Sequence, residues 1–227
     1  MARGEEITIE PLVSQEHFRE AVELQKTIWG FDEIELLPVR LFVVATKIGG
    51  HAFGAFDGDR MIAFCLAIPG IKPGGKAYLH SHMLGVLPGF RDLGIGRRLK
   101  LTQREDAIAR GIDLIEWTFD PLEVRNAYFN IERLGAIVRR YVRNQYGTTT
   151  SHLHGGLPTD RCIAEWWVAK ERITGAPVVE RISVQNDAGD RRAMQADLAN
   201  RLESAFDRGL AVTGFERDTY LLTEWPL

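Results

Sequence analysis

The segment from Lys76 to Leu99 constrains this chain more than any other part of its sequence. It reads KAYLHSHMLGVLPGFRDLGIGRRL, an extended run that breaks into a short glycine-containing turn and then into a helix. Gly94 and Gly96 let the backbone approach a ligand closely, and a helix that begins there directs unpaired N–H groups at an anion. The segment therefore predicts a strand, a turn and a helix that together hold a phosphate group.

Two glycines alone are typical of many strand-to-helix turns, so the neighbouring residues decide which kind of phosphate site is indicated. No Gly-Lys-Ser/Thr sequence follows, which excludes a P-loop. A dinucleotide-binding fingerprint requires a third glycine at position 99, where the chain has Leu99. The pattern that remains is Gln/Arg-x-x-Gly-x-Gly/Ala, formed here by Arg91, Gly94 and Gly96.

This pattern resembles the acyl-coenzyme A signature of the GNAT superfamily of N-acyltransferases. From His80 to Gly96 the sequence has the form H-x-H-x-L-x-V-x-x-x-F-R-x-x-G-x-G, which is similar to the arylalkylamine (serotonin) N-acetyltransferases. A further stretch, FDPLEVRNAYFNIERLGA, resembles an uncharacterised group of GNAT acetyltransferases. The resemblance implies an α/β fold, in which a mixed sheet with central, splayed parallel strands is flanked by helices.

The order of the expected elements agrees with that fold over roughly residues 7 to 168. Ser14 can cap a first helix, and Pro38 suits the first turn of a second. Further helices are expected over 94–110 and 125–134, and strands over 7–13, 52–56, 61–68, 76–86, 112–119, 136–145 and 161–168. We expect the strands at 76–86 and 112–119 to be parallel neighbours, because a helix separates them.

A helix and a hairpin are expected beyond this region. An i, i+4 apolar stripe predicts the helix, and Gly209 precedes two short strand-like runs. The sequence therefore predicts an acyltransferase domain over residues 1–170 and a C-terminal extension over 171–227 that packs on it.

Composition narrows the class of protein. With 227 residues and 45% hydrophobic content the chain can bury a full core. A formal charge of −3 and a pI near 6.1 give no reason to bind nucleic acid. The longest apolar run, Met61 to Ile68, has eight residues, which is too short to span a bilayer. We expect a cytoplasmic protein without membrane partners, in which Cys65 and Cys162 are reduced core thiols.

The resemblance also implies the residues that bind the cosubstrate, acetyl-coenzyme A or another acyl-coenzyme A. It places the pyrophosphate on backbone N–H groups of the turn and helix start, and the pantetheine beside the strand where the parallel strands splay. Asn126 and Asn130, on the helix 125–134, are further candidates. The predicted contacts on the strand, turn and helix start are Leu84, Gly85, Val86, Arg91, Asp92, Leu93, Gly94, Ile95, Gly96, Arg97 and Arg98.

A base must take a proton from the acceptor's ammonium group so that the neutral amine can attack. His80 and His82 lie on one face of a strand by its period of two, and a neutral imidazole accepts a proton at physiological pH. Glu116 on the expected neighbouring strand is the rival base, and a salt-bridged strand residue is its alternative interpretation. The sequence predicts that at least one of the two histidines acts in proton transfer.

The general acid is where the sequence departs from the family. The family pattern has a Tyr shortly before the glycine that ends the helix after the second parallel strand, and that position here is Ile131. Tyr128 lies three residues earlier, on nearly the same face of a regular helix, so it can substitute. Its alternative interpretation is a half-buried packing aromatic.

A polar loop, Gly147–Asp160, separates two apolar strands and is long enough to cover an acceptor. Arg143 and Arg161 flank it and could bind a carboxylate; the alternative is that they are surface arginines. His152 and His154 lie in the loop without Cys or acidic residues at metal spacing, so no metal site is predicted.

These features together predict an N-acyltransferase that moves an acyl group, preferably acetyl, from acyl-coenzyme A to a primary amine of a small molecule such as an amino acid. N-succinyl transfer to amino acids is one alternative. A coenzyme A-binding sensor without turnover is the other, because Ile131 stands where the family has Tyr. The sequence leaves a homodimer open.

Overall fold

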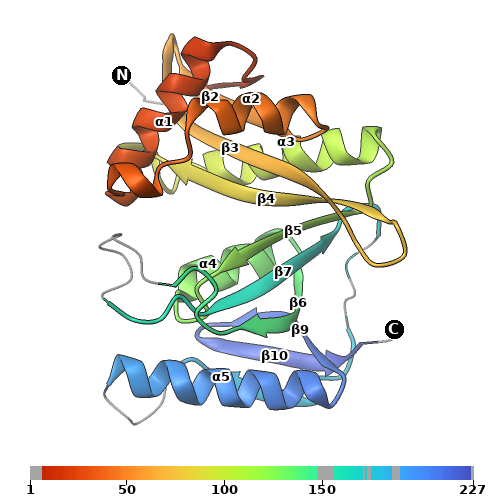
Figure 1. Cartoon of the computed structure of the whole chain (residues 1–227). Coiled ribbons are helices and arrows are strands. Elements are labelled where there is room, and N and C mark those ends of the chain that lie inside the picture. Colours follow the sequence, from red (N-terminus) through yellow and green to blue (C-terminus); the bar gives the residue numbers. More distant parts are fainter. Residues whose placement is uncertain (1–6, 148–155, 171, 173–174, 186–189, 226–227) are drawn as a thin grey trace. The chain divides into compact units, whose positions relative to one another are not determined.

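The computed structural model in Figure 1 describes residues 7–147, 156–170, 172, 175–185 and 190–225. These residues form two compact units, and the boundary lies within the strand Leu114–Phe119 (β5), between Ile115 and Glu116. The first unit contains the described residues up to Ile115, and the second contains those from Glu116 onward. The mixed α/β architecture expected from the sequence is confirmed.

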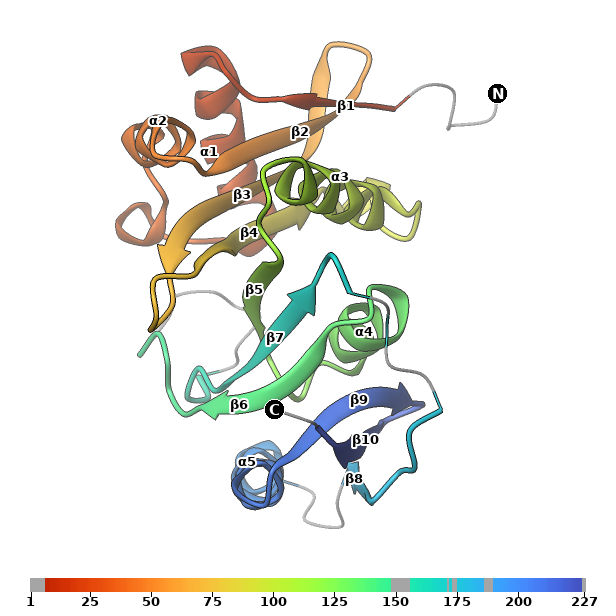
Figure 2. The ribbon, with the colours of Figure 1, turned by 90° about the vertical axis from the view of Figure 1, so that its right-hand side faces the viewer.

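The first unit is an antiparallel sheet with helices on both faces. Its strands pair in the order β1-β2-β3-β4. Figures 1 and 2 show α1 and α2 on one face of these strands and α3 on the other. The elements are β1 (Thr8–Pro11), α1 (Gln15–Trp29), η1 (Glu33–Glu35), α2 (Val39–Lys47), β2 (His51–Asp57), β3 (Arg60–Ile71), β4 (Ala77–Val86), η2 (Pro88–Phe90) and α3 (Ile95–Ala109).

Local sequence signals account for several of these boundaries. The Ser14 hydroxyl accepts a hydrogen bond from the backbone N–H of His17, as expected for the cap of α1. Pro38 directly precedes α2, and Gly94 caps α3 in the left-handed conformation. The core is formed by α1, α2 and the inner strands, where Phe42 and Phe64 are fully buried.

A β-bulge interrupts the pairing of β3 with β4. Leu66 pairs with Met83 and Ala67 pairs with Ser81, so His82 is an additional residue in β4. The bulge changes which residues face α3. Before it Ser81 faces this helix, whereas after it Leu84 and Val86 do. The simple alternation of a regular strand therefore does not hold along β4.

The described residues of the second unit form six strands in the order β5-β7-β6-β9-β10-β8. The pairs β7/β6, β6/β9, β9/β10 and β10/β8 are all antiparallel. Its other elements are α4 (Val124–Tyr128), a π-helical turn η3 (Phe129–Arg133), β6 (Ile137–Val142), β7 (Arg161–Trp167), β8 (Glu180–Ser183), α5 (Arg191–Asp207), β9 (Leu210–Glu216) and β10 (Thr219–Glu224).

The C-terminal elements continue the sheet of this second unit. Val212 of β9 pairs with Val138 of β6, and the buried stripe of α5 includes Leu198 and Leu202. The expected helix and hairpin are therefore present. Strand β8 was not expected, because its sequence ERIS is short and only Ile182 of its four residues is buried.

Candidate active site

The turn between β4 and α3 is held by hydrogen bonds to main-chain carbonyl groups. The Leu87 N–H donates to the Ile62 carbonyl at 2.9 Å, and the Arg91 Nε donates to the Val86 carbonyl at 3.3 Å. Asp92 and Gly94 both adopt positive φ, of 64° and 77°. This conformation presents the backbone from Arg91 to Arg98, which we call the cradle, at the N-terminal end of α3.

Gly96 lies in the first turn of α3, and glycine is a poorer helix former than alanine. A Cβ atom built at this position would meet only Leu84 Cδ2 at 3.5 Å and Val86 Cγ2 at 3.9 Å, which are ordinary contacts. Packing within the protein therefore does not require a glycine. A ligand that approaches this backbone closely does require one, so the cradle fits the pyrophosphate of coenzyme A.

The side chains of the cradle have different environments. Arg91, Asp92, Leu93 and Arg97 are exposed, so they can lie beside a bound anion. Ile95 is buried in the core, which leaves only its backbone for a ligand. Arg98 is exposed and donates to the Ile7 carbonyl at 2.7 Å, so part of its guanidinium fixes the start of β1.

The strand next to the cradle is arranged by packing on both sides. Leu84 and Val86 face the first turn of α3. Gly85 faces α1, where a Cβ would lie 2.6 Å from the Trp29 ring and 2.8 Å from Ile28. Gly85 is therefore required by helix packing, whatever its backbone contributes to ligand binding.

His80 and His82, the histidine pair, lie on β4 with ring centroids 5.8 Å apart. Both rings are half-buried. The pKa of His80 is lowered to about 4, chiefly by burial and in addition by the charges of His82, Lys100 and Lys72. Burial also lowers the pKa of His82. Both imidazoles are therefore neutral at physiological pH, the form that accepts a proton.

The lowered pKa of His80 predicts a loss of stability in acid. The folded value is about 4 and the ordinary value is 6.5, so the unfolded chain binds more protons between these two pH values. Stability is therefore lost as the pH falls from 6.5 towards 4, by up to about 3 kcal/mol. Urea unfolding at pH 7 and pH 4.5 should show a smaller acid loss in His80→Gln than in the parent. Equal losses in both proteins would contradict this prediction.

Glu116, the rival base, forms an ion pair with Arg140. It is 4% exposed, and the Arg140 guanidinium donates to its carboxylate. Arg140 also contacts Glu165, which binds Arg139 at 2.6 Å. Glu116 is therefore the salt-bridged strand residue that the sequence analysis gave as its alternative. Protonation of its carboxylate would weaken the attraction to Arg140, which makes Glu116 less suited to accept a proton.

The helix expected over 125–134 is interrupted by a π-helical turn. The Leu134 N–H donates to the carbonyl of Phe129, five residues earlier, at 3.1 Å. Tyr128 is 46% exposed whereas Ile131 is 0% exposed, so the two residues do not share a face as a regular helix would require. Asn126 is exposed, and the amide oxygen of Asn130 accepts from Trp117 Nε1 at 3.1 Å.

The two candidate acceptor arginines also differ. Arg143 is exposed and binds Glu203 at 2.6 Å and Asn200 at 2.7 Å on α5. Arg161 is buried, donates to the Asp160 carbonyl at 2.8 Å and lies over the Tyr146 ring. Burial lowers the pKa of Arg161, while the nearby Asp120 carboxylate raises it.

The central part of the predicted acceptor loop, with His152 and His154, lies outside the described residues. The structure therefore describes only the two ends of this loop.

Comparisons with known proteins agree with this geometry. The profile of the acetyltransferase (GNAT) family matches residues 18–135, just over half of the chain. The chain belongs to the GNAT acetyltransferase family. It is thus an acyl-coenzyme A-dependent acetyltransferase, and the matched region contains the cradle and the histidine pair. A comparison with curated protein sequences finds no match.

Solved structures show the same fold. The ribosomal-protein-S18-alanine N-acetyltransferase from Escherichia coli has a TM-score of 0.56 and 18% identity, covering 75% of this chain and 100% of its own. A GNAT family acetyltransferase from Elizabethkingia anophelis with acetyl-CoA bound has a TM-score of 0.55 and 14% identity, covering 72% and 99%. Arabidopsis thaliana Naa50, in complex with a bisubstrate analogue, has a TM-score of 0.54 and 13% identity, covering 70% and 97%.

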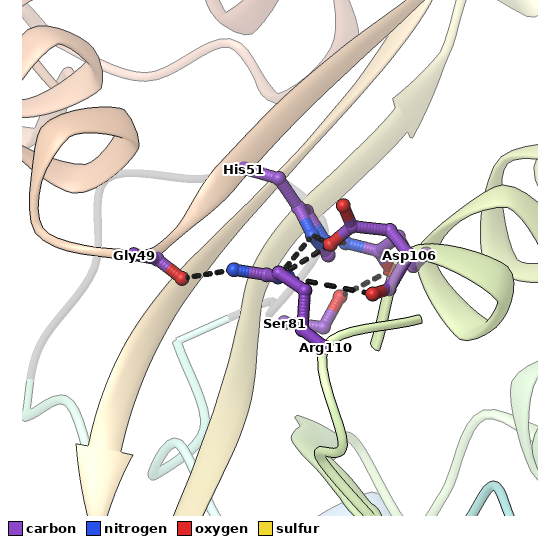
Figure 3. A network of polar contacts seen from close by, with 6 residues as sticks. Gly49, His51, Ser81, Asp106 and Arg110 are labelled. Atoms are coloured by element: carbon purple, nitrogen blue, oxygen red, sulfur yellow. Dashed lines mark hydrogen bonds and ion pairs between the residues drawn. The ribbon is translucent and has the colours of Figure 1, made fainter. Parts of the chain in front are cut away.

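The GNAT domain also contains a buried polar network that the sequence analysis missed. Figure 3 shows His51, Ser81 and Asp106 from three elements of the first unit, together with Arg110 and Gly49. The sequence signal was the polar pair Lys100 and Gln103, at i, i+3 spacing on a helix whose buried face is otherwise apolar.

Two kinds of feature are absent from the described residues. No helix among them is long and apolar enough to cross a membrane. Within the same residues, no group of three or more His, Cys, Asp or Glu side chains could hold a metal ion.

Proposed function

We propose that this GNAT acetyltransferase transfers an acetyl group from acetyl-coenzyme A to a primary amine of a small molecule, with the histidine pair as proton acceptor. The observation that supports this most strongly is the placement of two half-buried, neutral imidazoles on β4, the strand that leads into the cradle. Because both imidazoles are neutral over the physiological range, each has a ring nitrogen that can accept a proton.

The proposed reaction is a direct attack. The amine nitrogen forms a bond to the thioester carbonyl carbon, the carbon–sulfur bond breaks, and the ammonium proton passes to His80 or His82. The thiolate of coenzyme A then takes up a proton, for which Tyr128 is the proposed donor. A covalent relay through cysteine is disfavoured, because burial raises the pKa of Cys65 to about 12 and also that of Cys162.

The cradle is proposed to bind the pyrophosphate through the backbone N–H groups of Leu93 to Arg97. The first N–H groups of a helix have no acceptor within the helix, so they are available to an anion. Leu84, Gly85 and Val86 are proposed to border the pantetheine. Asn126 is exposed and could contact coenzyme A, whereas the Asn130 side chain must first release Trp117.

An amino acid is the proposed acceptor, and Arg161 is the residue proposed to bind its carboxylate. Arg143 is the weaker candidate, because Glu203 and Asn200 already bind its guanidinium. Arg161 presents a guanidinium that is buried against an aromatic ring, where a carboxylate is bound more strongly than in water.

A panel of amines tests this choice. We expect Arg161→Ala to raise the acceptor KM by about tenfold, the size of one lost charged hydrogen bond, with the KM for acetyl-coenzyme A unchanged. Arg143→Ala is the matched control and should alter the acceptor KM less. Thiol release with acetyl- and succinyl-coenzyme A measures both constants. Faster turnover of tryptamine-like amines than of any amino acid, with no effect of Arg161→Ala, would refute the amino acid acceptor.

A peptide amino terminus is the second candidate acceptor. The E. coli neighbour acts on an alanine of ribosomal protein S18, and Naa50 was solved with the analogue CoA-Ac-MVNAL. The panel should therefore include short peptides with Ala or Met at the first position. A higher kcat/KM for a peptide than for every free amino acid would assign the acceptor to this class.

A further inference from the structure

Polar side chains from β2, β4 and α3 form one continuous chain of contacts inside the first unit. Lys100 Nζ donates to Ser81 Oγ at 2.8 Å, and the Ser81 hydroxyl donates to Gln103 Oε1 at 2.9 Å. Gln103 Nε2 contacts His51 Nε2 at 3.0 Å. All four side chains are buried, and Lys100 is only 3% exposed.

The direction of these hydrogen bonds follows from the chemistry of each group. The amide oxygen of Gln103 accepts from Ser81, so its amide nitrogen faces His51 and Nε2 of that ring must accept. The proton of His51 is then on Nδ1, which lies 2.6 Å from Asp106 Oδ2. Figure 3 shows this end of the network, where Arg110 joins Asp106 to the Gly49 carbonyl.

Burying the Lys100 amine at this position costs desolvation free energy. Burial lowers the pKa of its ammonium group from 10.5 to about 7, and the interaction with the Cys65 thiol group, which raises this pKa, is the smaller effect. A methionine of similar length would avoid this cost, and replacing buried charged groups together with their partners by apolar groups is often neutral or stabilising. The stability of the fold therefore does not explain why an amine is present here.

The position of Ser81 suggests what the amine does. Ser81 is the residue between His80 and His82, and the β-bulge begins immediately after it. Its hydroxyl is held from α3 by two side chains, so this point of β4 is fixed to the helix. The charged and titratable groups that act on His80 are His82 on the same strand, Lys72 at the end of the β3–β4 hairpin, and Lys100 from α3.

We propose that Lys100 is a positioning residue for acetyl transfer, which anchors β4 through Ser81 at the bulge and adds a positive charge that opposes protonation of His80. This inference rests on the proposed role of the histidine pair as proton acceptor. Lys100 itself touches neither the acyl donor nor the acceptor in this proposal. At the pH near 4 where His80 titrates, Lys100 is fully protonated. Its positive charge therefore opposes the protonation that turns the neutral His80 imidazole into an imidazolium.

The test compares Lys100→Met and Ser81→Ala with Lys47→Met, an exposed lysine of α2 that serves as the control. Titration of the His80 imidazole followed by NMR, with His80→Gln for assignment, reports its protonation without any need for turnover. We expect Lys100→Met to raise the His80 midpoint by about half a pH unit or more, because one nearby positive charge is removed. Its melting temperature should stay at or above that of the parent.

Ser81→Ala distinguishes the anchoring of β4 from the effect of the Lys100 charge on His80. This variant should keep the His80 midpoint of the parent but lower kcat at least about threefold, because β4 loses its anchor while Lys100 stays charged. In Lys100→Met, kcat should fall and the acid limb of the rate profile should move to higher pH, with the KM for acetyl-coenzyme A unchanged. Lys47→Met should match the parent in every measurement.

Two results would overturn the proposal. One is a His80 midpoint in Lys100→Met that equals the parent value. The other is a normal kcat in both Lys100→Met and Ser81→Ala. If instead no amine supports turnover in the parent, the proposed base role of the histidines fails, whereas the NMR midpoint still decides whether Lys100 controls the charge of His80.

Discussion

Replacing His80 or His82 by glutamine should lower kcat about 100-fold or more at neutral pH in at least one of the two variants. Glutamine keeps the size and a hydrogen-bonding group but cannot accept a proton from the ammonium. In the affected variant the acid limb of the rate profile should vanish or move, because that limb reports the protonation of the base. Turnover measured from pH 4 to pH 9 by release of free thiol gives both quantities.

His17→Gln is the matched control for this experiment. His17 lies on α1 with its ring against Phe56, at a centroid distance of 5.4 Å, and has no proposed part in catalysis. It should keep the rate profile of the parent. If both β4 variants also keep that profile, the histidine pair is not the base. Glu116 or an ordered water then becomes the leading candidate, and Arg140→Gln, which releases Glu116 from its ion pair, becomes the variant to measure.

The second large effect is expected at the cradle. Gly96→Val should weaken acetyl-coenzyme A binding at least tenfold, about 1.4 kcal/mol, because its γ carbons fill the space that the pyrophosphate needs. Gly96→Ala should give a smaller loss, since it adds one carbon atom at this position and no γ carbons. Isothermal titration calorimetry with coenzyme A measures both affinities.

Gly89→Val is the control for a valine in the same turn. Nothing lies within 4 Å of a Cβ at Gly89, which is exposed and outside the cradle. Its affinity should match that of the parent, and circular dichroism should show that all three variants are folded. Unchanged affinity in a folded Gly96→Val protein would show that the pyrophosphate does not bind at this helix start.

The cradle could be predicted from sequence because its physics is local. A strand, a turn with Gly94 in the left-handed conformation and a helix start follow one another within a few residues, and each leaves a signal in the sequence. The proximity of His80 and His82 followed equally from the period of a strand. These features need no knowledge of which distant segments pack together.

The remaining features depend on irregular backbone or on tertiary packing. The bulge at His82 adds one residue to β4, and the π-helical turn after Tyr128 adds one to a helix, so counting by regular periods fails beyond each. The same irregular turn separates the exposed Tyr128 from the buried Ile131, and the role of Tyr128 as proton donor stays a prediction. Lys100 was missed because a lysine in a helix is usually exposed, and only packing of α3 against β4 buries it.

The most direct test of catalysis is to incubate the purified protein with acetyl-coenzyme A and an amine, and to follow free thiol and product mass together. The amine should be the best substrate of the panel described above. We predict thiol release that depends on the amine, and a product heavier than the amine by one acetyl group. Binding of acetyl-coenzyme A with no amine-dependent thiol release from any amine or peptide would contradict acetyl transfer and identify the chain as a coenzyme A sensor.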